Sequence, residues 1–125
     1  MAMLKQIVVD CEHPAKLARF WSETLDGFDM RPYDQAEINR LAGLGFTPET
    51  DPTVLLDGPG REMCFQRVTL GPMSEKRRLH LDIATSQIDH EVRRLVGLGA
   101  TIVEYFTAHV WMRDPEGNDF CVTAA

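Results

Sequence analysis

The amino-terminal part of the chain has an apolar run followed by apolar positions at helical spacing. Residues 4–9 (LKQIVV) are mostly apolar and β-branched, which is typical of a strand. The pair His13-Pro14 marks a helix start, because proline fits the first helical position. The helix continues through AKLARFWSETL, and Gly27 ends it. Its apolar stripe consists of Leu17, Phe20, Trp21 and either Leu25 or Thr24.

The same order of elements returns about 74 residues later along the chain. Residues 79–84 (LHLDIA) alternate apolar and polar side chains as a strand does. Ser86 and Asp89 form a capping-box pattern ahead of IDHEVRRLVGLG, in which Gly99 again ends the helix. The buried stripe of this helix would be Ile88, Val92, Leu95 and Val96. The repetition predicts a duplicated module.

Three further strands are expected in each half. In the second half they are 101–106, 109–113 and 119–123, and the turn Asp114-Pro115-Glu116-Gly117-Asn118 joins the last two. Aspartate and asparagine suit such a turn, so Asp114 and Asn118 are read as structural. In the first half the strands are 28–33, 54–57 and 62–69, with a short helical insertion over 34–45. Each half is then a βαβββ module.

The whole chain is expected to be one α+β domain. Its 125 residues, 44% hydrophobic and 26% charged, suit a single globular domain. Module one covers about residues 1–70 and module two about 78–125, with a glycine- and proline-containing linker over about 71–77. The two modules are expected to form a curved, half-open mixed sheet around a cleft, with the helices outside. Such a cleft suits a small-molecule ligand.

Charge and cysteine content exclude several classes of protein. The net charge of -6 disfavours binding to nucleic acid, and Lys76, Arg77 and Arg78 are the only basic run. No apolar segment approaches the roughly 20 residues that cross a bilayer, and no signal peptide is recognised, so we expect a cytoplasmic protein without membrane contact. Cys11, Cys64 and Cys121 are widely spaced and fit reduced thiols.

Three stretches together resemble one known family. They are IVVDCEHPAKLARFWSETLDGF, then MCFQRV with KRRLHLDI, and finally WMRDPEGNDFCV. Over nearly the whole chain they resemble the glyoxalase-like branch of the glyoxalase/bleomycin resistance protein/dioxygenase (vicinal oxygen chelate) superfamily. The resemblance implies the βαβββ fold, and also a homodimer, since members often pair modules between chains.

The resemblance also implies a set of possible metal ligands. In metal-using members, four side chains near the inner ends of strands hold a divalent ion that polarises vicinal oxygens of the substrate. Matching motif to motif places Gln6, Gln66, His80 and Cys121 at these positions, whereas the family has a carboxylate where Cys121 stands. One imidazole, two amides and one thiol carry little charge unless Cys121 ionises, in which case zinc is the favoured ion. The expected cofactor is therefore none or a divalent metal.

Three of these four side chains also have an ordinary structural explanation. His80 could be hydrogen-bonded within the sheet, Gln66 could face water, and Cys121 could be packed in the core. Aromatic and imidazole side chains could line a pocket for a flat ligand, although filling the core is their default role. The pocket residues we expect are Tyr33, Phe46, Phe65, His109 and Trp111.

Three functions remain open on the sequence. The first is a small-molecule-binding protein of unknown ligand without a complete metal site. The second is a divalent-metal-dependent lyase, isomerase or ring-cleaving dioxygenase that acts on vicinal oxygens, with Gln6, Gln66, His80 and Cys121 as ligands. The third is an interaction module that uses an exposed sheet edge and no ligand.

Overall fold

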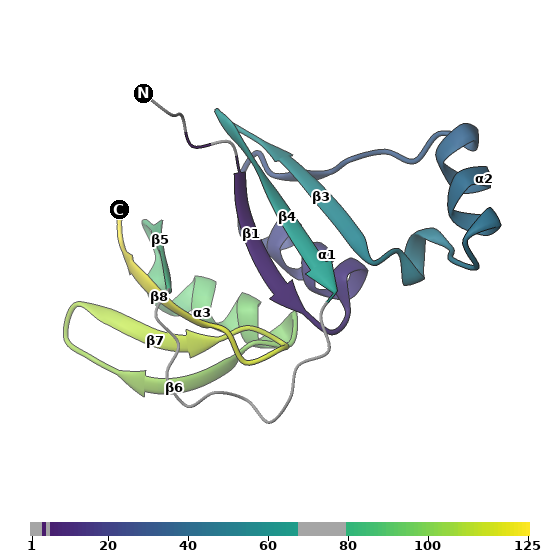
Figure 1. Cartoon of the computed structure of the whole chain (residues 1–125). Helices are drawn as coiled ribbons and strands as arrows, with labels where there is room; N and C mark the ends of the chain where they lie inside the picture. The colour runs from purple at the N-terminus through teal and green to yellow at the C-terminus, as the bar shows by residue number, and fades with distance from the viewer. Residues whose placement is uncertain (1–3, 5, 68–79) are drawn as a thin grey trace. The chain divides into compact units, whose positions relative to one another are not determined.

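The structure, a computed structural model, describes residues 4, 6–67 and 80–125, so the linker expected over 71–77 lies outside the described residues. The chain divides into two compact units, Met1–Gly71 and Pro72–Ala125, called unit one and unit two below (Figure 1). No helix in the described part of the chain is both long and apolar enough to cross a membrane.

Unit one is a four-stranded mixed sheet with one helix before its second strand and further helical segments before its third. The strands lie in the order β1-β4-β3-β2, with β1 parallel to β4 and the other pairs antiparallel. The elements are β1 (Gln6–Cys11), α1 (Pro14–Thr24), β2 (Asp29–Met30), α2 (Gln35–Gly43), the 3-10 helix η1 (Pro48–Thr50), β3 (Thr53–Gly58) and β4 (Arg61–Arg67).

Unit two repeats this topology without the helical insertion. Its strands lie in the order β5-β8-β7-β6, and β5 is parallel to β8 as β1 is to β4. The prediction of two βαβββ modules in an α+β fold is confirmed. The elements are β5 (Leu81–Thr85), α3 (Ile88–Gly97), β6 (Thr101–Tyr105), β7 (His109–Arg113) and β8 (Asp119–Ala124).

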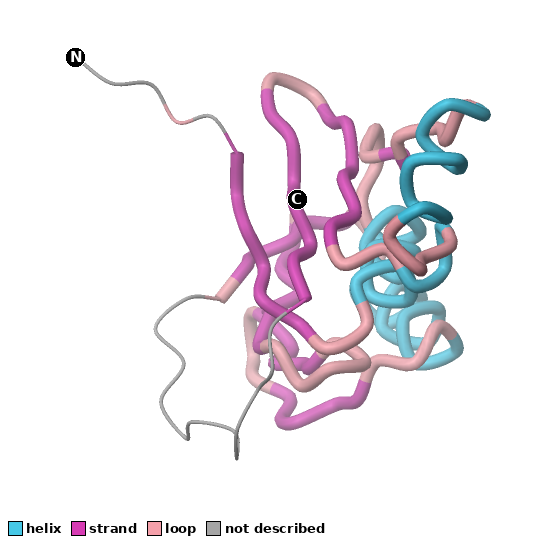
Figure 2. Tube along the Cα trace, turned by 45° about the vertical axis from the view of Figure 1, so that its right-hand side comes forward, coloured by secondary structure: helices cyan, strands magenta, loops and turns pink. Residues whose placement is uncertain are grey.

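One face of each sheet is covered by a helix of the same unit, as the cyan helices and magenta strands of Figure 2 show. In unit one, α1 packs on β3 and β4 and buries Leu17, Phe20 and Trp21. The helix-facing positions of these strands include Leu56 and Phe65, both without exposed surface. The side chains that alternate with them point to the opposite face, because successive residues of a strand point to opposite sides. We call this opposite face of each sheet its open face.

In unit two, α3 packs on β6, β7 and β8. The core is formed by alternate residues of β7 and β8 together with the helix, and its fully buried side chains include Met112, Phe120, Val122, Val92 and Leu95. Burial of these apolar side chains is the main stabilising contribution to such a unit.

Some local predictions differ from the structure. The capping box of Ser86 and Asp89 is wrong, because α3 begins after Gln87 without a side-chain cap. Val96 is 45% exposed, since it lies on the side of α3 that turns away from the sheet. The strand expected over 28–33 is limited to Asp29–Met30. The glycine helix stops are confirmed: Gly27 and Gly99 have φ angles of 77° and 109°, a region that favours glycine.

The turn between β7 and β8 depends on a buried carboxylate. Asp114 is 3% exposed, and its Oδ1 accepts hydrogen bonds from the backbone nitrogens of Glu116 and Asn118, both at 2.9 Å. Its Oδ2 accepts one from Nδ2 of Asn118 at 2.8 Å. The structural reading of Asp114 and Asn118 is therefore confirmed.

Gly58 at the end of β3 provides a test of packing in unit one. A Cβ at this position would lie 2.2 Å from Cε1 of Phe28, so the phenyl ring would have to move. We expect Gly58→Ala to lower the free energy of unfolding by about 1–3 kcal/mol, the usual range for overpacking. Urea denaturation measures this change. Gly43→Ala is the control, because a Cβ there meets no atom within 4 Å, and it should leave stability unchanged or slightly raised. Equal effects of the two substitutions would contradict the prediction.

Candidate functional site

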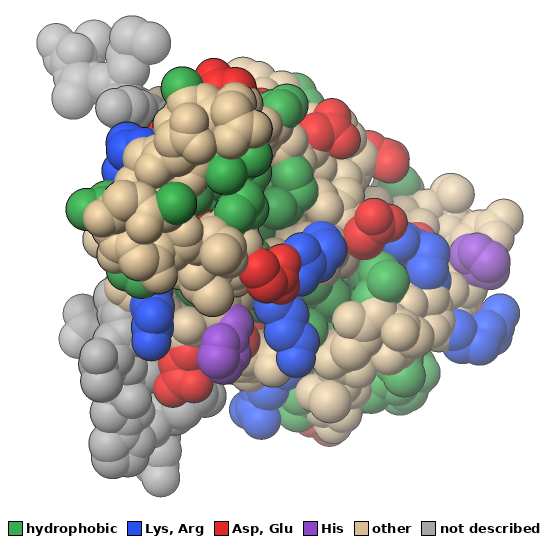
Figure 3. Space-filling model, turned by 90° about the vertical axis from the view of Figure 1, so that its right-hand side faces the viewer, with side chains coloured by type: hydrophobic (Ala, Val, Ile, Leu, Met, Phe, Trp, Pro, Cys, Tyr) green, Lys and Arg blue, Asp and Glu red, His purple; other side chains and the backbone are tan. Residues whose placement is uncertain are grey.

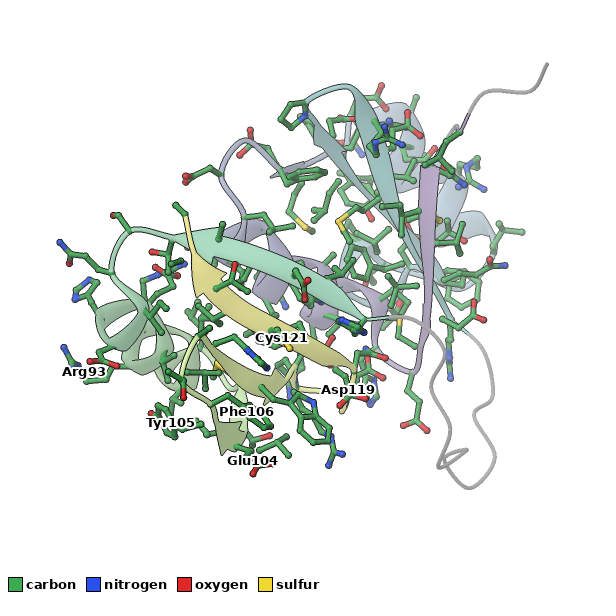
Figure 4. The ribbon with its side chains drawn as sticks, turned by 90° about the vertical axis from the view of Figure 1, so that its left-hand side faces the viewer. Arg93, Glu104, Tyr105, Phe106, Asp119 and Cys121 are labelled. Atoms are coloured by element: carbon green, nitrogen blue, oxygen red, sulfur yellow. The ribbon has the colours of Figure 1, made fainter. Side chains whose placement is uncertain are left out.

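The open face of unit two carries a row of four side chains, one from each strand. Cys121 pairs across the sheet with Asp82 on one side and with Trp111 on the other, and Trp111 pairs with Glu104. Paired residues of neighbouring strands point to the same face. We call Asp82, Cys121, Trp111 and Glu104 the central row. Figure 4 labels Cys121 on β8 and Glu104 on β6.

A β-bulge brings Glu104 into this row. The strand register shifts between Ile102 and Glu104, so Ile102 pairs with Met112 of the core face while Glu104 pairs with Trp111 of the open face. Strict alternation would place positions 102 and 104 on the same face. Sequence analysis therefore missed Glu104, and no alternation pattern would have found it.

Trp111 is held in place by its neighbours. Its indole Nε1 donates a hydrogen bond to Oδ1 of Asp119 at 3.1 Å. The guanidinium carbon of Arg113 lies 5.6 Å from the centre of the Trp111 ring, within the range of a cation–π contact. Arg113 Nε also donates to Asp119 Oδ1 at 3.0 Å, so the charges of this arginine and this aspartate offset one another.

A second aromatic group lies beside the central row. His109 is two residues before Trp111 on β7 and therefore on the same face. Its ring stacks on Phe106, with ring centres 4.6 Å apart and an angle of 16° between the planes. Phe106 is 45% exposed. The open face of unit two thus has a tryptophan ring and a stacked ring pair next to each other.

The thiol of Cys121 is in surroundings that keep it protonated. Burial raises the pKa of Cys121, and the nearby carboxylates of Asp82 and Asp119 raise it further because a thiolate beside them would be repelled. A protonated thiol is a weak nucleophile and a weak metal ligand.

The open face of unit one is dominated by an ion-pair network. Arg31 Nη2 lies 2.5 Å from Oδ1 of Asp57 and 2.6 Å from Oε1 of Glu62. Across the sheet, Glu62 pairs with Gln6 and with Asp57. Other acidic and basic side chains of unit one are also paired, such as Arg40 with Glu37, and the two kinds lie beside one another on the surface in Figure 3.

The strand register separates the two glutamines predicted as metal ligands. Gln6 pairs with Glu62, whereas Gln66 pairs with Asp10. The two glutamines are thus four positions apart along the parallel pair, about 13 Å at the usual rise of a strand. Both lie on the open face of unit one, but the structure does not bring them together.

The internal repeat gives the position on β4 that corresponds to Cys121. In unit two, His80 is two residues before Asp82, which pairs with Cys121. In unit one, Gln6 is two residues before Val8, which pairs with Cys64. The counterpart of Cys121 is therefore Cys64 and not Gln66. The sequence contains a signal for this, because each cysteine stands between two apolar residues, in MCF and in FCV.

Within each unit, the residues at the candidate ligand positions do not fit a divalent metal. Cys64 is 5% exposed, and burial, then Glu62 and Asp10, raise its pKa. His80 is exposed, with Nε2 at 3.4 Å from Oδ1 of Asp82. No group of three or more histidine, cysteine, aspartate or glutamate side chains that could hold a metal ion occurs in residues 4, 6–67 and 80–125.

The residues predicted to line a pocket are divided among several places. His109 and Trp111 lie together on the open face of unit two, as described above. Phe65 has no exposed surface and belongs to the core of unit one, so its prediction as a pocket residue is wrong: it points to the helix-facing side of β4. Tyr33 donates its hydroxyl hydrogen to Asp51 Oδ2 at 2.7 Å, and burial, then this hydrogen bond, raise its pKa. Phe46 follows α2 and is half-buried.

Comparison with known protein families identifies the family to which the chain belongs. A family model described as "Glyoxalase-like domain" matches residues 6–123. The chain belongs to this family. It is thereby a member of the vicinal oxygen chelate superfamily, as the sequence predicted. None of the curated proteins matches the chain in sequence.

Solved structures with the same fold have little sequence identity to this glyoxalase-like chain. A glyoxalase/bleomycin resistance protein/dioxygenase family enzyme from Burkholderia phytofirmans PsJN has a TM-score of 0.69 and 15% identity over 98% of each chain. The fosfomycin resistance protein FosX from Mesorhizobium loti has a TM-score of 0.68 and 9% identity over 100% of this chain and 93% of its own. A putative glyoxalase from Bacillus halodurans has a TM-score of 0.67 and 14% identity over 100% and 97%. These similarities support the fold alone.

The reactivity of Cys121 tests its electrostatic surroundings. We expect Asp82→Asn to speed alkylation of Cys121 by iodoacetamide about two- to fivefold at a pH below the thiol pKa, because removing the carboxylate increases the thiolate fraction. Mass spectrometry of the Cys121 peptide gives the rate. Asp89→Asn on α3 removes the same charge outside the open face and should leave the rate unchanged. An unchanged rate in Asp82→Asn would contradict the role of Asp82 and leave burial and Asp119 as the causes of the raised pKa.

Proposed function

We propose that this glyoxalase-like protein binds a flat small molecule on the open face of unit two without the help of a metal. The arrangement of Trp111 carries the proposal. Its indole is held at one edge by Asp119 and lies beside the stacked pair of Phe106 and His109. Rings that are fixed in place lose little conformational entropy when a ligand stacks on them.

The chemistry of the same face favours binding over catalysis. A nucleophile needs a base that accepts its proton, and the only thiol in the central row has carboxylate neighbours that raise its pKa. The metal-dependent alternative needs ligands that are negatively charged or easily ionised. Glu62 is bound by Arg31, and both open-face thiols have raised pKa values. A lyase, isomerase or dioxygenase reaction therefore has less support here than ligand binding.

Several expectations about the protein's surroundings stay predictions from the sequence. They are a cytoplasmic location, a homodimer, and the absence of nucleic-acid and membrane partners. The net charge of -6 supports the expected absence of nucleic-acid partners, because phosphate backbones are also negatively charged.

Binding of a neutral planar probe tests the proposed site. We expect acridine, uncharged at mildly alkaline pH, to bind the protein and Trp111→Ala to weaken binding about tenfold, because a major stacking surface is lost. Isothermal titration calorimetry measures the affinity. Tyr105→Ala is the matched control: Tyr105 is 58% exposed on the same hairpin but pairs with Val110 of the core face. Equal loss in both variants, or no binding by the unsubstituted protein, would contradict the proposal.

Metal content tests the alternative. We expect elemental mass spectrometry of protein purified without added metal or chelator to find far less than one equivalent of zinc, iron, manganese or nickel, and a chelator to leave acridine binding unchanged. One equivalent of metal that disappears in His80→Ala would overturn the metal-free proposal and favour the metal-dependent enzyme.

A further inference from the structure

We propose that the ligand of this face is a planar organic cation, held over the central row with Asp82 and Glu104 as its counter-charges. This inference rests on the proposed function and adds the charge of the ligand to it. The observation behind it is the position of these two carboxylates in the same cross-strand row as Trp111.

The row places one carboxylate on each side of the tryptophan. Neighbouring strands are about 4.8 Å apart, so Glu104 is one strand from Trp111 and Asp82 is two strands from it on the other side. Both residues are exposed. A flat molecule stacked on Trp111 therefore has a carboxylate within reach at either end, and each carboxylate can approach the ligand without first being uncovered.

Among its described residues, the open face of unit two carries more acidic than basic side chains. Arg113 is bound to Asp119, which offsets the only guanidinium among the described residues of the face. Asp82 and Glu104 have no arginine or lysine partner among the ion pairs of the described residues, although His80 lies 3.4 Å from Asp82. Among the described residues, a ligand on the central row therefore meets the field of two carboxylates that form no ion pair with arginine or lysine. This field attracts a cation and repels an anion.

The aromatic side chains favour the same ligand. The face of an indole ring carries partial negative charge and attracts cations. Trp111 already does this with Arg113, whose guanidinium carbon is 5.6 Å from the ring centre. The stacked rings of Phe106 and His109 extend the flat surface beside it. A planar cation with delocalised charge stacks on the rings and is also attracted by the carboxylates. A neutral ring system makes only the stacking contact.

Three acridines with one ring system and different charges test the inference. They are 9-aminoacridine, a cation; acridine, neutral at mildly alkaline pH; and acridine-9-carboxylate, an anion. We expect calorimetry to give 9-aminoacridine an affinity about tenfold above that of acridine, with the anion weakest, and this advantage to shrink as salt is added. Equal affinity for the cation and the neutral acridine would overturn the inference and leave the proposed function standing. Binding of none of the three would overturn both.

Substitution of the two carboxylates locates the effect. In Asp82→Asn/Glu104→Gln the ratio of the 9-aminoacridine affinity to the acridine affinity, in which any common change of the stacking surface cancels, should fall below about threefold. The control Asp26→Asn/Asp89→Asn removes the same total charge from a turn and a helix, outside the open faces, and should keep the advantage. If the control lost it equally, the preference would come from the net charge of the protein and the assignment to Asp82 and Glu104 would be wrong.

Discussion

The parallel pairing of the first and last strand in each unit is the constraint on which the rest of the structure depends. It joins the two ends of each βαβββ unit into one sheet on which a helix packs. It also determines which side chains share a face, because a shift of one residue would exchange the two faces of a strand. With the observed register, the apolar residues of β4 and β8 face α1 and α3, and Glu62, Gln66, Asp119 and the two thiols face the other way. This register places Asp82 beside Cys121 and Val8 beside Cys64 on the open faces.

The two units use the same scaffold for different chemistry. Their parallel pairs place Cys64 and Cys121 at equivalent positions, yet the neighbours of the two thiols differ. Cys64 lies between Val8 and Leu55, and its row is apolar. Cys121 lies between Asp82 and Trp111, in a row that combines charge with an aromatic ring. The proposed ligand site therefore lies in unit two, where stacking and electrostatic contacts are both available.

The family relationship and the local chemistry answer separate questions. The glyoxalase-like match over residues 6–123 accounts for the topology of both units. It does not determine the reaction, because one fold can carry many unrelated sites. In this chain, one imidazole, amides and thiols stand at the candidate ligand positions, and the carboxylates nearby either bind Arg31 or raise the thiol pKa values. These contacts are the reason to favour a metal-free binding protein over an enzyme of the same fold.

The sequence by itself determined the duplicated βαβββ order, the helical insertion after β2, the turn at Asp114 and the family, since these depend on local periodicity, turn residues and motifs. Only the tertiary structure decided the site. The pairing of strands distant in sequence placed Phe65 in the core, separated Gln6 from Gln66 and made Cys64 the counterpart of Cys121. The bulge in β6 moved Glu104 beside Trp111. Register between strands far apart in the chain has no local signature, because long-range hydrogen bonds and burial fix it together.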